Sequence, residues 1–115
     1  MLEKDQLLLL DVKTAGVINS FMPDTNKIAD LVKFYSVFSK ESRLKILSAL
    51  SISKMCVSDI SRMLEMNQTT VSHELRVLKD YRLVKCKRQG KIIFYEVCDG
   101  VVDRLFLDGI EYLGY

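Results

Sequence analysis

The sequence predicts one mostly α-helical domain with a single small β-hairpin. Apolar residues recur at helical spacing along most of the chain, and two β-rich segments are separated by Gln89-Gly90. A length of 115 residues fits one domain, and 49% apolar and 28% charged residues are ordinary values for a folded protein. A chain of this size leaves little room for a deep catalytic cleft, so we expect a binding module or small dimer rather than a large enzyme.

Two helices are expected before residue 40. Apolar residues at 8, 12, 15 and 18 predict an N-terminal helix over residues 7–18, and the turn-forming residues in 19–24 mark a break after it. A second helix should begin at Asp24 or Thr25 and end at Phe38. Its apolar face consists of Ile28, Leu31, Val32, Tyr35 and Phe38.

A third helix and a short fourth helix should follow. Ser39 is the expected N-cap of the third helix, whose inward residues are Leu44, Leu47 and Leu50. Residues 55–57 are expected to form a short strand. Ser58 should cap the fourth helix, whose core-facing residues are Ile60, Met63 and Leu64.

A longer helix, a hairpin and a last helix complete the chain. Asn67 should cap a helix over residues 68–81, with Val71, Leu75 and Leu78 facing inward. The β-formers in 83–88 and 91–97 predict a hairpin that pairs Arg88 with Lys91. The last helix should begin at Asp99.

A short helix, a sharp turn, a longer helix and a basic hairpin occur in the order of a winged helix-turn-helix, with residues 58–81 as the helix-turn-helix and 83–97 as the wing. The outer face of the longer helix is polar, as a helix that enters the major groove of DNA requires. Basic residues near the hairpin tip suit contact with phosphates. The expected DNA-contacting residues are Gln68, Thr69, Thr70, Ser72, His73, Arg76, Lys85, Lys87, Arg88, Gln89 and Lys91.

The charge distribution is uneven in the same region. The whole chain has a net charge of +2, but residues 67–96 hold seven basic and three acidic side chains, and residues 97–115 hold one basic and four acidic ones. A basic block of this kind suits nucleic acid as a partner. Charge alone does not distinguish such a site from an ordinary solvated surface.

Four segments carry a specific pattern: residues 41–47 (ESRLKIL), 55–60 (MCVSDI), 70–78 (TVSHELRVL) and 83–91 (LVKCKRQGK), followed by Phe94-Tyr95. With these segments the chain resembles the ArsR/SmtB family of bacterial winged-helix transcriptional repressors. The resemblance implies a homodimer that binds operator DNA of imperfect two-fold symmetry and releases it when an inducer binds.

The resemblance also implies dimerisation through the N- and C-terminal helices, residues 1–22 and 99–115. The wide apolar stripe of the last helix agrees, because a second copy would bury it. Burial within one chain is the alternative. The expected interface residues are Leu8, Val12, Val102, Leu105, Phe106, Gly109, Ile110 and Leu113.

The inducer site departs from the family pattern. Many members bind soft metals through Cys-Val-Cys, where this chain has Cys56-Val57-Ser58. Others hold zinc, cobalt or nickel on the last helix, where Asp99 matches but positions 101, 112 and 115 are valine and tyrosines. Zinc needs three or four ligands, so we expect no such site there. The only histidine, His73, is expected to be a DNA or structural residue rather than a ligand.

The three cysteines leave a thiol sensor open. Cys86 should pack beside Ile93 on the buried face of the hairpin. Cys56 and Cys98 lie at element boundaries and could approach each other, which makes them candidates for binding arsenite or another soft ion, or for oxidation. Cys56 is the first candidate because the positive end of a helix makes a thiol more reactive. Two structural cysteines are the alternative.

Other classes of protein have less support. The sequence contains no Gly-rich phosphate loop, no nucleophile elbow and no second histidine for a general base, so we expect no enzyme. A winged helix used only for protein–protein contact, or a DNA-binding regulator without an inducer, is the alternative. The odd cysteine count and the short apolar run at the start predict a cytoplasmic protein with reduced thiols and no membrane partner.

Overall fold

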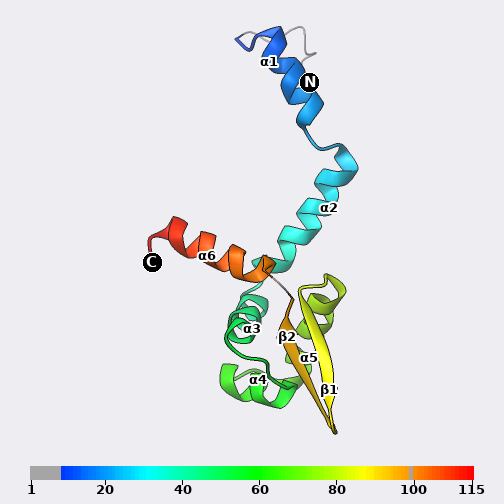
Figure 1. Cartoon of the computed structure of the whole chain (residues 1–115), viewed down its shortest axis with the longest axis vertical. Helices are drawn as coiled ribbons and strands as arrows, with labels where there is room; N and C mark the ends of the chain where they lie inside the picture. The colour runs from blue at the N-terminus through cyan, green and yellow to red at the C-terminus, as the bar shows by residue number, and fades with distance from the viewer. Residues whose placement is uncertain (1–8, 99) are drawn as a thin grey trace. The chain divides into compact units, whose positions relative to one another are not determined.

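The computed structural model describes residues 9–98 and 100–115. It confirms the mostly α-helical class with one hairpin (Figure 1). In chain order the elements are α1 (Val12–Phe21), α2 (Thr25–Ser36), the 3-10 helix η2 (Val37–Ser39), α3 (Glu41–Ile52), α4 (Val57–Leu64), α5 (Gln68–Asp80), β1 (Val84–Gln89), β2 (Ile92–Val97) and α6 (Val101–Leu113). The chain forms two units, the first ending at Lys33 and the second beginning at Phe34, and each is described by itself.

The first unit holds α1 and most of α2. The Asp11 carboxylate accepts a hydrogen bond from the Thr14 amide at 2.7 Å and so caps α1. The helix therefore begins after this residue, and the expected start at residue 7 is wrong for residues 9–11, while residues 7 and 8 lie outside the described part of the chain. Asp24 caps α2 in the same way, by accepting from the Lys27 amide at 2.8 Å.

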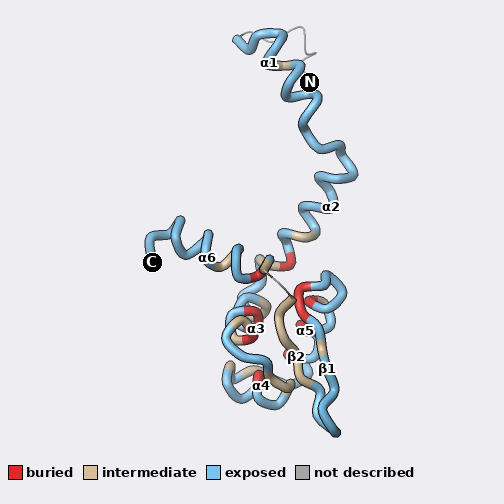
Figure 2. The backbone as a smooth tube through the Cα atoms, viewed as in Figure 1, coloured by how far each residue is buried: buried red, intermediate tan, exposed pale blue. Residues whose placement is uncertain are grey.

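The second unit contains the apolar core. Its buried positions lie on the helices of this unit and at the start of β1 (Figure 2). The helices α3, α4 and α5 contact one another, and α3 also contacts β2 and α6. The core residues are Val37, Ile46, Leu47, Leu50, Ile60, Val71, Leu75, Leu78, Leu83, Val84 and Val102.

Two expected caps are wrong. Ser39 lies inside η2, so Lys40 precedes α3 instead. Cys56, not Ser58, is the N-cap of α4. The reason in the second case is that Met55 pairs with Tyr95 and ends the extended segment there, so the helix begins immediately after Cys56. The expected strand at residues 55–57 is reduced to this single pairing.

Two expected core residues are also wrong. Leu44 and Met63 are exposed. On α3 the buried set is Ile46, Leu47 and Leu50, because the helix presents a face rotated from the one that the leucine spacing suggested. On the two turns of α4, Ile60 is fully buried and Leu64 packs against the core one turn later.

The hairpin turn lies one residue further along the chain than expected, so each residue of β1 pairs two residues further along β2. Gln89 pairs with Ile92, so the two-residue turn is Gly90-Lys91, and Gly90 has a φ of +64°, which glycine adopts without steric penalty. Arg88 therefore pairs with Ile93 rather than Lys91. Cys86 pairs with Tyr95 rather than Ile93, although it shares a face with Val84 as expected.

The helix α6 begins at Val101, and the expected start at Asp99 lies outside the described residues. Val102 is 1% exposed and packs in the core of its own chain, so its expected place in an interface between copies is wrong. Phe106 is partly buried against the same core, whereas Ile110 and Leu113 are exposed. Among the described residues, no helix is both long and apolar enough to cross a membrane.

The core assignment predicts a contrast between two residues of α3. Leu47 is fully buried and Ile52 is 86% exposed. Leu47→Ala should lower the free energy of unfolding by about 2–5 kcal/mol, because it leaves a cavity among the helices. Ile52→Ala should change it by less than about 0.5 kcal/mol. Urea unfolding at fixed protein concentration measures both, and equal losses would contradict the assignment.

Candidate nucleic-acid interface

The turn between α4 and α5 is fixed by local hydrogen bonds. Glu65 ends α4 in the left-handed conformation, with a φ of 53°, and the Ser61 hydroxyl donates to the Met66 carbonyl. The Asn67 side chain accepts from the Thr69 amide at 2.7 Å and caps α5, as expected. These bonds set the direction in which α5 leaves α4.

The two faces of α5 have different character. Val71, Leu75 and Leu78 are buried, as the spacing predicts. The polar residues on the other side are all exposed: Gln68, Thr69, Thr70, Ser72, His73 and Arg76. Because α5 also packs on α4 and β1, this polar face and the hairpin belong to the same unit.

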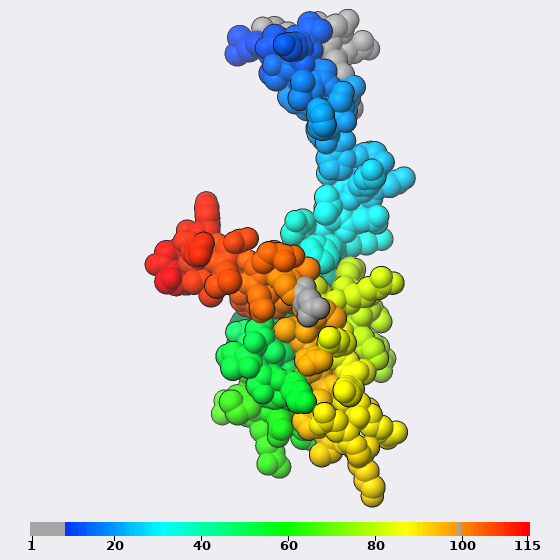
Figure 3. Space-filling view, in the orientation of Figure 1, coloured from blue at the N-terminus to red at the C-terminus, as the bar shows by residue number. Residues whose placement is uncertain are grey.

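The hairpin presents its basic residues to solvent. Its tip projects from the second unit (Figure 3). Strand alternation places Lys85, Lys87 and Gln89 on one face and Arg88 on the other, and Lys91 lies in the turn. All five are exposed, and the Lys85 ammonium is 3.7 Å from the Glu96 carboxylate.

A further basic residue lies beside the hairpin. The Lys54 ammonium lies over the ring of Phe94, 5.5 Å from its centroid, and Phe94 pairs with Lys87. Lys54 therefore adds a positive charge to the hairpin face that carries Lys87. No sequence pattern predicts this position for Lys54, because it lies in a loop distant in sequence and only the pairing of Met55 with Tyr95 brings it there.

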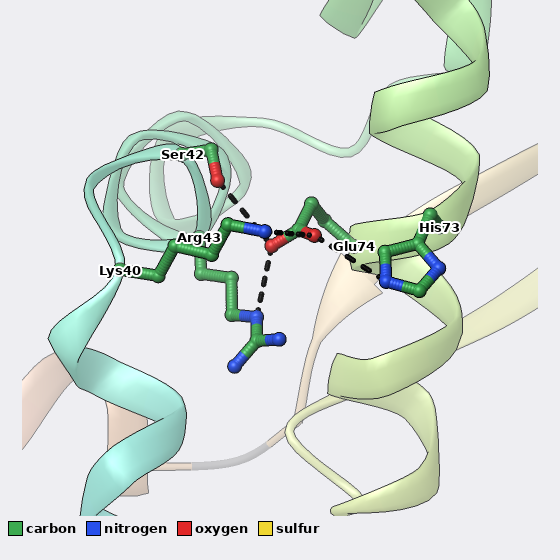
Figure 4. Close-up of polar contacts among 5 residues, drawn as sticks. All are labelled: Lys40, Ser42, Arg43, His73 and Glu74. Atoms are coloured by element: carbon green, nitrogen blue, oxygen red, sulfur yellow. Dashed lines mark hydrogen bonds and ion pairs between the residues drawn. The ribbon is translucent and has the colours of Figure 1, made fainter.

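The only charged side chain buried in residues 9–98 and 100–115 is Glu74, on the inner side of α5. Its Oε1 accepts from Lys40 Nζ at 2.9 Å, and its Oε2 accepts from Arg43 Nε at 2.8 Å and from the Ser42 hydroxyl at 3.3 Å (Figure 4). His73 Nε2 is 3.9 Å from Oε1. The carboxylate thus joins the middle of α5 to the beginning of α3.

The sequence held a signal for this network. Glu74 lies three residues after Val71 and four before Leu78, which places it on the apolar face of α5. A carboxylate at such a position requires a cationic partner. In the sequence Glu74 is only one of the three acidic side chains counted in residues 67–96, and nothing local identifies Lys40 and Arg43 as its partners.

The environment of Glu74 shifts its titration. Burial alone would raise the pKa of this carboxyl, but hydrogen bonds from Lys40 and Arg43 and their positive charges outweigh it, and the pKa lies below the ordinary value of 4.5. A folded-state pKa below the unfolded value means that the network stabilises the fold above about pH 4.5. The stabilisation is lost as the pH falls through the folded-state pKa.

This shift predicts a pH-dependent difference between two variants. Glu74→Gln should lower the free energy of unfolding at pH 7 by about 3 kcal/mol, because it leaves Arg43 without its charged partner. The difference from wild type should shrink as the pH falls below 4.5, since Glu74 becomes protonated and resembles the amide. Glu41→Gln removes a carboxylate that is 83% exposed and should change little at either pH.

Urea titrations between pH 3 and pH 8 measure these differences. If the free energy of unfolding of Glu74→Gln lay below that of wild type by the same amount across this range, ionised Glu74 would not be the source of the stability.

The expected sensor cysteines do not lie together. All three cysteines are partly buried free thiols. Because Met55 pairs antiparallel with Tyr95, Cys56 continues toward Ile93, while Cys98 lies three residues beyond Tyr95 in the other direction. Four strand steps of about 3.3 Å separate them by about 13 Å along the strand. The expectation that they could approach each other is therefore wrong.

Cys86 and the side chains that can ligate metals are the other groups from which a sensor could be built. Cys86 Sγ accepts from Lys79 Nζ at 3.3 Å. In residues 9–98 and 100–115, no group of three or more histidine, cysteine or acidic side chains is arranged to hold a metal ion. Asp99 lies outside those ranges.

The architecture and the polar face of α5 define a winged helix-turn-helix protein. Residues 40–85 match the profile of the family described as bacterial regulatory protein, arsR family. The chain is 34% identical over 83 residues to a transcriptional repressor SmtB homolog from Synechocystis, covering 72% of this chain and 63% of that protein. It is 33% identical over 87 residues to the HTH-type transcriptional regulator NmtR of Mycobacterium tuberculosis, covering 76% and 72%.

A solved structure agrees with the sequence relatives. A homodimeric winged helix-turn-helix DNA-binding domain from Mycobacterium bovis superposes with a TM-score of 0.64 at 28% identity, over 81% of this chain and 88% of that one. The chain therefore belongs to the arsR family, a family of transcriptional regulators rather than enzymes. It spans less than two thirds of the length of the SmtB homolog.

Proposed function

We propose that this chain is a homodimeric, sequence-specific DNA-binding repressor that leaves its operator when an inducer binds. The observation that carries the proposal is the outer face of α5. Six neighbouring polar side chains are exposed there on a helix whose inner side is fixed by Glu74, with a basic hairpin in the same unit. A helix with this composition suits base edges, and a basic hairpin suits phosphates.

The proposed division of labour separates α5 from the hairpin. Ser72, His73 and Arg76 read base edges, while Gln68, Thr69 and Thr70 place the helix on the DNA. The hairpin contacts the DNA backbone through Lys85, Lys87, Arg88, Gln89 and Lys91. Lys54 contacts it as well. A protein–protein module would not require hydrogen-bonding side chains along the outer face of α5.

Exposed apolar surface supports the proposed dimer. In α6, Leu107, Ile110 and Leu113 are exposed, and in α1 Val12 and Phe21 are more than four-fifths exposed. Leu105 and Phe106 also line an apolar depression of about 180 Å³. A second copy would bury these surfaces, and the homodimeric state of the Mycobacterium bovis domain supports self-association. Of the expected interface residues, Leu8 lies outside the described part of the chain.

The proposed inducer acts through Cys56. The residue caps α4 and lines an open depression of about 450 Å³ with Ser58, Lys91 and Ile93 among others. Thiolates bind arsenite and soft metal ions and react with oxidants, and α4 packs directly on α5. Cys98 is a second, independent candidate.

The division of labour predicts two kinds of loss. Arg76→Ala should cost about 1–3 kcal/mol of discrimination at the base it reads. Lys87→Ala should weaken binding to all duplexes alike and lower the slope of log K against log salt by about one unit per lost phosphate contact. Lys45→Ala, a charge-matched change on α3 of the same unit at a residue already paired with Glu41, should leave that slope unchanged.

Salt-titrated binding to a duplex selected by the wild-type protein and to a scrambled duplex measures both effects. If Lys87→Ala altered the base preference and Arg76→Ala did not, the roles assigned to α5 and the hairpin would be reversed. A wild-type protein that binds neither duplex would favour the protein–protein alternative.

The sensor proposal predicts a selective loss of response. Peroxide, which needs only one thiol, should release the wild-type protein from the selected duplex, and Cys56→Ser should abolish that release because it removes the reactive thiol. Cys86→Ser is the matched control and should respond like wild type. Release by Zn(II) or Ni(II) that survives Cys56→Ser would contradict the proposed sensor.

A further inference from the structure

The ion-pair network around Glu74 has two attachment points on one carboxylate. Lys40 binds Oε1, whereas Arg43 and Ser42 bind Oε2, so the plane of the carboxylate is fixed and not only its position. Arg43 is the stronger anchor, since its side chain is 18% exposed against 52% for Lys40. All three donors come from the beginning of α3, so the network fixes the rotation of α5 about its own axis relative to α3.

Stability alone does not account for such a network. Replacing a buried ion pair by well-packed apolar residues is often neutral or stabilising. The neighbours of Glu74 on the inner side of α5 are Val71, Leu75 and Leu78, so an apolar residue would suit this face. What the ion pair adds is a fixed rotation of α5 about its axis, because hydrogen bonds have preferred angles that contacts between methyl groups lack.

The rotation of α5 matters at this position because the residues proposed to read bases flank Glu74. Ser72 and His73 precede it and Arg76 follows two residues later. A helix with its side chains is about 10–12 Å across, so a rotation of about 10° moves an outer side chain by about 1 Å. Hydrogen bonds to base edges tolerate only a few tenths of an ångström around their preferred length.

From this geometry we infer that Glu74 is a positioning residue for base reading. It sets the rotation of α5 against Arg43 and Lys40, and the discrimination between DNA sequences depends on it although the buried carboxylate cannot touch DNA. The inference rests on the proposed DNA-binding function and adds a specificity-determining residue to it.

The test separates positioning from stability. Glu74→Gln removes the charge, and Glu41→Gln is the control with the same change of net charge at an exposed position. The double variant Arg43→Met with Glu74→Leu replaces the ion pair by apolar side chains. It restores packing but not the hydrogen bonds that fix the rotation of α5. Dissociation constants are measured for the selected and the scrambled duplex at one salt concentration, and urea unfolding is measured alongside.

The discrimination ratio between the two duplexes should fall at least tenfold in Glu74→Gln and in the double variant. Binding to the scrambled duplex should match that of Glu41→Gln within about twofold for Glu74→Gln, because this binding depends on charge. The double variant should unfold at a urea concentration close to that of wild type.

A double variant with wild-type stability and wild-type discrimination would overturn the inference while leaving DNA binding intact. If Glu74→Gln does not fold, the double variant alone decides. If neither folds, Lys40→Ala is used: it frees one carboxylate oxygen, and a ratio that stays at the wild-type value would likewise overturn the inference. Equal binding of both duplexes by the wild-type protein is a different result, which contradicts the proposed function itself.

Discussion

The contact between Glu74 and the beginning of α3 is the interaction on which the arrangement of the second unit depends. It places a charge inside an apolar core, which is tolerated only because Lys40 and Arg43 approach within 3 Å of its oxygens. Since α5 in turn contacts α4 and β1, the direction of α5 also sets where the hairpin lies. One buried carboxylate thereby links the apolar core to both proposed DNA-contacting surfaces.

The same unit shows how a small domain divides its surface. The inner face of α5 supplies three of the core residues, and the outer face supplies the exposed polar side chains. Exposed apolar residues recur on α1, on α2 and along the outer half of α6, and others lie on α3, on α4 and at the start of β2. A chain that uses one face for DNA and another for a second copy keeps the two contacts independent, as the proposed repressor requires.

Local sequence patterns predicted the individual helices and the hairpin well, but not how distant segments pair and pack. The α5 boundaries, its Asn67 cap and its buried residues followed from spacing and side-chain chemistry. The register of the hairpin, the cap of α4 and the burial of Val102 depend on pairing and packing between distant segments, and no local pattern contains them. The partners of Glu74 and the position of Lys54 were missed for the same reason: each lies more than 30 residues away along the chain.

In the proposed repressor, two copies of α5 enter successive major grooves on one face of DNA. Protection of guanine N7 from methylation reads the major groove directly, on a duplex selected by the wild-type protein. Two such helices should give two protected groups with centres about 34 Å apart, one helical turn of DNA. A single protected group, or binding that leaves every N7 reactive, would contradict it.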